Sequence, residues 1–421
     1  MTPYVAVDVL RERNFLRLFL GQATSTIGDR IVFIALALYV TEIGSPTDVG
    51  VVLAAATFPL VAFLLIGGVL DDRLPRHKVM IATDLMRFAL HALLAALIFA
   101  GTIEIWHIVV IEALFGTAEA FFRPAYTGLV PQTVPEERIQ DAKAATGALE
   151  TVAEFVGPAL ATVLVLGLGA GWAFALDALT FLVSVAFLAG VRPRARGQAE
   201  ARRSVLLELR DGWTEVRSRA WVWVTLVVFA LALLLCFGPW TTLGPTVAEE
   251  RYGSHGVFGL LAAALGVGTM IGALLGFRLR PRHPMRMGML CVLPWPAVTV
   301  GCAVGIPLVL LVPLFAVAGA GLSLFGVWWE TALAERIPPH RLSRVSAYDW
   351  SASLALLPIG FLLAGPLGEA LGPSTVLAVG GALATVALAA GVFVRETWTY
   401  TSPRSAPPAT ILAVDGGLGP P

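Results

Sequence analysis

The sequence predicts an all-α polytopic membrane protein, with twelve transmembrane helices arranged as two pseudo-symmetric six-helix bundles. The chain has 421 residues, of which 57% are hydrophobic and only 14% charged. A soluble domain of this size carries roughly a quarter charged residues. Twelve long apolar runs and an internal repeat complete the prediction. This composition argues against a soluble enzyme, and the formal net charge of zero argues against nucleic acid as a partner.

Each predicted helix is an apolar run long enough to cross a bilayer, which takes about 20 residues. All basic residues except Arg30, Arg87 and Arg251 fall at one set of alternate loops and helix ends. Because positive loops stay inside, both termini are expected to be cytoplasmic in a bacterial plasma membrane. The predicted spans are 15–42, 49–70, 79–101, 105–127, 144–168, 171–191, 221–243, 256–277, 287–304, 307–329, 346–370 and 373–394.

The longest inner loop lies midway along the chain and divides it. We expect an N-terminal bundle over 1–191, a cytoplasmic linker over 192–220, a C-terminal bundle over 221–398 and a disordered tail over 399–421. Within the linker, SVLLELRDGWTEV (204–216) has apolar and charged residues at helical spacing, which predicts an amphipathic helix on the membrane surface.

The two predicted bundles share sequence features. A shift of 203 residues aligns VPEERIQDAKA (134–144) with IPPHRLSRVSA (337–347), and places Gly116 on Gly319 and Gly157 on Gly360. A shift of 208 aligns GVLDDRLPRHK (68–78) with GFRLRPRHPMR (276–286). Parallel repeats of this kind are typical of transporters whose binding cavity lies between the halves.

The loop GVLDDRLPRHK (68–78) resembles the major facilitator superfamily pattern G-x-x-x-D-[RK]-x-G-[RK]-[RK]. Pro75 stands in place of the usual glycine and His77 in place of one basic residue. Gly157 and Pro158 are similar to a pair that antiporters of this superfamily carry in the fifth helix. The resemblance implies the major facilitator fold and transport by alternating access.

Three further segments resemble the drug-efflux group that includes macrolide exporters and the enterobactin exporter. They are RNFLRLFLGQATSTIGD (13–29), AFFRPAYTGLVPQTVPEER (120–138) and GWAFALDALTFLVS (171–184). One departure concerns coupling: many relatives carry a proton-coupling arginine four residues before a glycine of helix 4. Here Glu112 stands at that distance from Gly116, so the role must fall to Arg30, Arg87 or an acidic group alone.

Four carboxyl groups at bilayer depth are the proton-coupling candidates, because ionisable groups there are costly unless they are paired or hydrated. Asp29 lies near the midplane of helix 1, and its alternative role is a structural ion pair with Arg30 or another base. Glu112 has no local partner in helix 4. Glu150 and Glu154 are four residues apart, so one is expected to be protonated or paired with Arg87 or Arg30.

Asp84, Arg87 and His91 have the spacing i, i+3 and i+7, which places them on one face of helix 3. Together with Arg30, these residues are expected to form an intramembrane ion pair that locks helix 3 to its neighbour. The alternative is a proton relay through His91. We favour the ion pair. Glu119 with Arg123, and Asp177 alone, are expected to be structural.

The loop between helices 2 and 3 predicts a cytoplasmic gate rather than a substrate site. An aspartate there pairs with a basic group, or caps a helix of the other half, when the cavity opens outward. The alternative is that these charges only fix topology. The gate residues are Gly68, Asp72, Arg73, Arg76, Arg341 and Arg344.

Aromatic residues are candidates to line a cavity for a bulky amphipathic substrate, although aromatic residues near helix ends are more often interfacial anchors. These candidates are Phe121, Phe122, Trp240, Trp328 and Trp329. Cys236, Cys291 and Cys302 fall in apolar runs without metal-binding spacing, so neither a metal nor a cofactor is expected.

The sequence therefore predicts a secondary active transporter that exports drugs or small secreted metabolites in exchange for protons. It would work as a monomer in the bilayer, and it is not expected to be an enzyme, because no phosphate-binding loop, HExxH or GxSxG motif is found in a suitable loop. The alternatives are a proton symporter that imports a small metabolite, and a membrane sensor or scaffold that does not transport.

Overall fold

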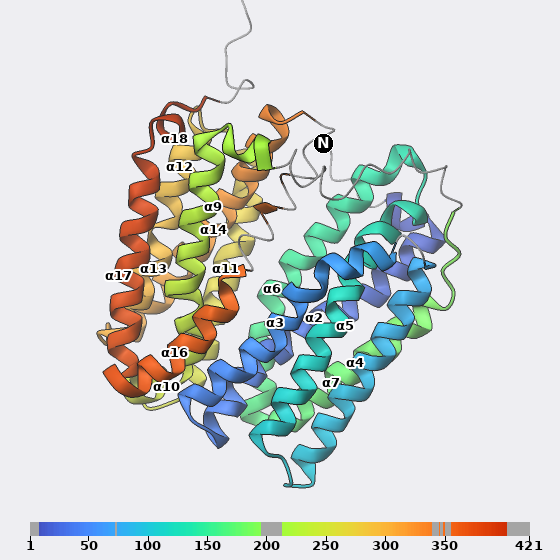
Figure 1. Cartoon of the computed structure of the whole chain (residues 1–421), viewed down its shortest axis with the longest axis horizontal. Coiled ribbons are helices and arrows are strands. Elements are labelled where there is room, and N and C mark those ends of the chain that lie inside the picture. The colour runs from blue at the N-terminus through green and yellow to red at the C-terminus, as the bar shows by residue number, and fades with distance from the viewer. Residues whose placement is uncertain are drawn as a thin grey trace, which may run out of the picture.

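The computed structural model describes residues 8–71, 74–194, 213–338, 345, 348–349 and 355–401. Within these ranges the regular elements are all helical, as the apolar runs predict, and Figure 1 shows them as two groups of long helices. Eleven helical segments of the described chain are long and apolar enough to cross a membrane, and Leu357–Leu371 is a shorter apolar helix. The predicted all-α polytopic fold is confirmed.

The first group contains six helices joined by short connections, so that neighbours in sequence run antiparallel. They are α2 (Arg13–Ile43), α3 (Pro46–Asp71), α4 (Arg76–Phe99), α5 (Ile105–Thr133), α6 (Ile139–Leu168) and α7 (Ala170–Leu188). Short 3₁₀ helices at Val9–Arg11 and Glu136–Arg138 precede α2 and α6.

The second group repeats this plan, with two of its spans interrupted. One span runs through α9 (Ala220–Ala232), a π-helical turn η3 (Leu233–Phe237) and α10 (Gly238–Tyr252). Another joins α12 (Pro284–Val292) to α13 (Pro294–Ala303), because Pro294 lacks the N–H that would continue the helix. The other helices are α11 (Gly256–Arg278), α14 (Leu308–Arg336), α16 (Leu357–Leu371), α17 (Pro373–Val392) and the short α18 (Arg395–Thr399).

The glycines that the repeat aligns occupy matching places in the two groups. A Cβ atom on Gly116 of α5 would lie 1.8 Å from the Ala56 carbonyl oxygen of α3, and one on Gly319 of α14 would lie 1.9 Å from the Leu265 oxygen of α11. Only glycine allows the helix backbones to approach this closely. The two halves therefore share their packing as well as their loop patterns.

Close contacts between the two groups gather at the end away from the arginine-rich loops. A Cβ on Gly365 of α16 would lie 2.4 Å from the Cα of Thr47, and one on Gly259 of α11 would lie 1.9 Å from the Thr162 hydroxyl of α6. The Thr47 amide also donates to Glu369 Oε1 of α16 at 3.1 Å. In Figure 1 the groups approach each other near α16 and α10, and diverge toward the end at which α12 and α18 lie.

Most of the predicted linker helix at 204–216 lies outside the described residues. Residues 213–217 are helical, and the Glu215 side chain is buried and forms an ion pair with Arg219. The bounds of the two bundles, the linker and the tail stay predictions.

Candidate functional site

A cluster of buried charges occupies the interior of the first group and is centred on Arg87 of α4. This guanidinium is inaccessible to solvent and forms ion pairs with Asp84 on its own helix and with Glu119 Oε2 of α5, the latter at 2.8 Å. Its NH1 lies 3.8 Å from Asp29 Oδ2 of α2. The Phe122 and Phe181 rings lie 3.9 and 4.5 Å from the guanidinium carbon. Arg87 thus joins three helices through its charge.

One helical turn further along α4, His91 lies between two more carboxyl groups. Its Nδ1 is 2.5 Å from Asp177 Oδ2 of α7, and its Nε2 is 3.5 Å from Glu112 Oε1 of α5. The ring stacks on Phe115, with the ring centres 4.2 Å apart. Because His91 and Asp177 are fully buried and Glu112 is nearly so, this trio is shielded from water.

Neutral side chains complete the hydrogen bonds around Asp84. The Ser184 hydroxyl of α7 donates to Asp84 Oδ2 at 2.7 Å, and the Gln22 amide of α2 donates to that hydroxyl at 3.3 Å. Buried polar networks of this kind specify one packing arrangement, since each member costs free energy if it is left unpaired. They fix how α2 and α7 pack on α4.

We name these groups the charge cluster. Its members are Asp29, Asp84, Arg87, His91, Glu112, Glu119, Arg123 and Asp177. Five carboxyl groups meet two guanidinium groups, so full ionisation would leave three negative charges, or two if His91 is charged. Uncompensated charge in a membrane interior is costly.

Asp29 is the most exposed carboxyl group of the cluster. Its side chain is 33% exposed, yet its Oδ1 atom is buried without a hydrogen-bond partner. The next residue, Arg30, pairs with Glu154 Oε1 of α6 at 3.1 Å, and both of these side chains are 43% exposed. Asp29 thus contacts both the sealed interior and the accessible side of α2.

An accessible polar surface, which we name the central face, lies between the two groups. Glu150 of α6 is exposed and feels the charges of Arg30, Glu154 and Arg123 in its own group and of Glu330 on α14 in the other group. Glu330 in turn feels the charge of Asp349. Exposed charges facing the partner group indicate a hydrated passage between them.

Glu330 and Asp349 were missed by sequence reasoning. Glu330 follows two tryptophans near the end of an apolar run, a place that is typical of a helix end at the membrane surface. The structure instead places Glu330 inside α14, which continues to Arg336. An expected helix that extended past Glu330 would have made this residue a candidate.

The predicted gate is only partly within the described chain. Arg76 is buried at the start of α4, and its NH1 donates to the Gly128 carbonyl of α5 at 2.5 Å, within one group. Gly68 lies in α3. The other gate residues, Asp72, Arg73, Arg341 and Arg344, lie outside the described residues, so the gate stays a prediction.

Four of the five aromatic candidates are buried in helix packing. Phe122 packs on Arg87, Trp240 packs between Phe258 and Phe315, and the indole N–H groups of Trp328 and Trp329 donate to Leu279 O and to Asp349. Phe121 is partly exposed. Contact of these rings with a substrate stays a prediction.

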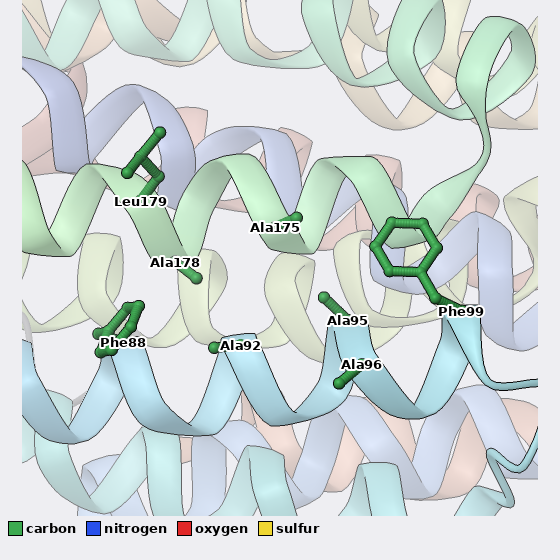
Figure 2. Close-up of a pocket in the computed structure, with 8 residues that line it drawn as sticks. All are labelled: Phe88, Ala92, Ala95, Ala96, Phe99, Ala175, Ala178 and Leu179. Carbon is green, nitrogen blue, oxygen red and sulfur yellow. The ribbon is translucent and has the colours of Figure 1, made fainter.

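The face of α4 next to the charge cluster is apolar. Figure 2 shows a groove between α4 and α7, lined by Phe88, Phe99 and Leu179 and by alanines of both helices, with a volume of about 390 Å³. Its small side chains let α4 approach α7, which brings His91 to Asp177 on the inner side. The groove has no ionisable lining residue, so it supports the charge cluster without belonging to it.

Comparison with known proteins agrees with this architecture. The chain is 26% identical over 374 residues to macrolide efflux protein A of Streptococcus pyogenes, covering 85% of this chain and 90% of that protein. It is 26% identical over 366 residues to the multidrug efflux pump Tap of Mycolicibacterium fortuitum, covering 83% and 88%.

Solved structures share the fold at low sequence identity. The nucleoside transporter NupG superposes with a TM-score of 0.72 at 13% identity, over 92% of this chain and 99% of that one. A bacterial homologue of the lysosomal transporter Spinster, solved facing inward, gives 0.63 at 17% identity, over 93% and 95%. The model of the Major Facilitator Superfamily matches residues 18–352. The chain belongs to the Major Facilitator Superfamily, a family of membrane transport proteins.

Proposed function

We propose that the chain is a proton-coupled exporter of drugs or small secreted metabolites, and that Asp29 is its coupling group. The observation that carries the proposal is the position of Asp29, one-third exposed beside the central face and 3.8 Å from the buried guanidinium of Arg87. A group that exchanges protons with water and also contacts a buried cation couples the two environments.

Protonation of Asp29 would change the forces within the charge cluster. The ionised carboxylate attracts Arg87, while the neutral acid leaves Arg87 to Asp84 and Glu119 alone. Because Arg30 follows directly and pairs with Glu154, a small shift of α2 also alters the link from α2 to α6. Proton binding at Asp29 thereby acts on two of the helices that border the central face.

Alternating access is proposed as rocking of the two groups. The glycine contacts at Gly365 and Gly259, and the hydrogen bond from Thr47 to Glu369, hold one end together. The charged central face stays accessible from the other end, which the arginine pattern assigns to the cytoplasm. We propose that the structure represents the inward-open state, and that these contacts separate when the outward-open state forms.

The substrate class is proposed from the relatives, whose names include macrolide and multidrug efflux. The first compounds to test are therefore a macrolide and a small panel of amphipathic drugs.

Transport in proteoliposomes tests the proposal. With an imposed pH gradient, the wild-type protein should move its substrate uphill, and Asp29→Asn should lose uphill movement because an amide exchanges no proton. The variant should retain counterflow of labelled against unlabelled substrate, which needs rocking but no coupling. Arg251→Gln, which removes a charge near the end of α10 in the second group, is the control.

The outcomes separate the alternatives. Uphill transport that persists unchanged in Asp29→Asn removes Asp29 as the coupling group. Accumulation of substrate by expressing cells, rather than depletion, would favour an importing symporter. Absence of transport and of ligand-induced thermal stabilisation across the panel would favour a sensor or scaffold.

A further inference from the structure

The charge cluster has an inner part that the proposed coupling step does not use. His91, Asp177 and Glu112 come from three different helices and are all buried, at 0%, 0% and 2% exposure. The rings of Phe115, Phe174 and Phe181 surround the imidazole. This trio lacks the exposure of Asp29.

Two facing atoms of the trio lack hydrogen-bond partners. His91 Nε2 and Glu112 Oε1 are both buried, are 3.5 Å apart, and make no hydrogen bond in the described structure. A buried polar atom without a partner costs free energy. One proton between nitrogen and oxygen, with a small closing movement, would satisfy both atoms at once.

The trio also adjoins Asp29. Asp177 lies against the backbone of α2, since a Cβ on Gly28 would be 2.2 Å from Asp177 Oδ1. Gly28 directly precedes Asp29, whose own Oδ1 is buried without a partner. The charges of Asp177 and His91 both act on Asp29.

We propose that His91, Asp177 and Glu112 form a second proton-binding site, sealed from the central face, whose occupancy is coupled to the protonation of Asp29. The exchangeable proton lies between His91 Nε2 and Glu112 Oε1, and Asp177 holds the other ring nitrogen. The charged and titratable groups that face His91 are Asp177 on α7, Glu112 on α5, Asp29 on α2 and Arg87 on α4. Proton binding at this second site does not require that the chain transports a substrate. Any influence of the site on proton-coupled transport rests on the proposed function.

Proton binding at His91 and proton binding at Asp29 influence each other. While Asp29 is ionised, its charge favours a proton on His91, and protonation of Asp29 weakens that preference. The two sites therefore bind protons with negative coupling, which reciprocity requires to act in both directions. The trio would thus tune the pH at which Asp29 exchanges its proton.

Nitrogen-15 NMR of the histidine rings in the purified full-length chain tests this directly. The chain has six histidines, and His91→Gln identifies the His91 signal by its loss. If that variant does not fold, a protein with the other five histidines replaced by Gln leaves His91 alone. The signal is followed against pH in wild type, Glu112→Gln, Asp29→Asn and the exposed-carboxylate control Glu136→Gln.

Removal of either nearby carboxylate should move the midpoint of the His91 titration to lower pH by about one unit, and Glu136→Gln should leave it unchanged. A midpoint equal in all four proteins, or a His91 ring whose protonation does not change between pH 4 and 10, would overturn the proposal. If the midpoint of the His91 titration shifts as expected but the protein shows no proton-driven transport, the second proton-binding site is supported and the proposed function is rejected.

Discussion

The interiors of the two groups differ more than their backbones do. Inside the first group, Asp84, Arg87, His91, Glu112 and Asp177 are buried. The buried polar side chains of α9 to α17 in the described chain are neutral threonines, such as Thr242 and Thr299. Two copies of one helical plan therefore hold, in one case, a charged centre and, in the other, an apolar core.

The repeat allows this difference to be followed position by position. The shift of 208 places Asp84, Arg87 and His91 on Val292, Trp295 and Thr299, and the shift of 203 places Glu112 on Phe315. Gly157 packs on Arg30 while its counterpart Gly360 packs on Leu234, so Asp29 corresponds to Leu233. These five ionisable groups of the first half thus have neutral counterparts in the second.

Burying charges has a free-energy cost that packing alone does not require, because an apolar core of the same shape is as stable or more so. The second group shows that this fold can be built with such a core. The charges of the first group therefore call for a functional explanation, and proton exchange provides one. Under the proposed function, the proton-binding groups lie in the first half.

The strongest challenge to this comparison is to place a charge in the apolar half. Phe315 is 1% exposed and packs on Trp240. Phe315→Glu should lower the free energy of unfolding by on the order of 5 kcal/mol, because the described part of α9 to α17 offers its carboxyl group no buried cation and the ring packing is lost. Unfolding in a denaturing detergent measures the change. Phe315→Leu is the control, and equal stability of the two variants would show that the second interior tolerates charge.

The next largest effect is expected from the central cation of the first half. Arg87→Met keeps most of the side-chain volume but leaves Asp84 and Glu119 without their main partner. We expect a loss of about 3–5 kcal/mol at neutral pH, since breaking a buried pair leaves an uncompensated charge.

The matched control for Arg87 is Arg123→Met. Arg123 also pairs with Glu119, but its side chain is 44% exposed, so the loss should stay below about 1 kcal/mol. Comparable losses for the two arginines would mean that burial of the charge cluster does not determine its energetics.

The smallest effect concerns the boundary between the halves. Gly365→Ala places a methyl group against the Thr47 backbone, whereas Gly147→Ala on α6 meets no atom within 4 Å. The first should weaken the closed end by about 1–3 kcal/mol. Distances between spin labels on α3 and α16 should then broaden for Gly365→Ala alone. Unchanged distances would show that this contact does not hold the closed end.

Much of this architecture could be predicted from the sequence, because transmembrane spans depend on local apolar runs. The shared face of Asp84, Arg87 and His91 follows from helical spacing, and the structure turns all three inward. Their partners could not be assigned, since the contact of His91 with Asp177 depends on how α4 packs on α7. Glu112 was expected to be without a local partner, and its neighbour His91 comes from another helix.

The sequence also could not show which arginine pairs with which carboxylate. Arg30 and Arg87 were both candidate partners for Glu150 and Glu154, and only the rotation of α2 directs Arg30 to Glu154 and Asp29 to Arg87. The electrostatic influence of Glu330 on Glu150 depends on how the two groups are placed together, which no local pattern encodes.

The most direct test of the central claim is the release of protons when substrate binds to purified protein in weakly buffered detergent, followed with a pH-sensitive dye. Wild type and Leu233→Asn should each release about one proton for every substrate bound, and Asp29→Asn should release none. Equal release from Asp29→Asn and wild type would contradict the assignment of proton exchange to Asp29 in the first half.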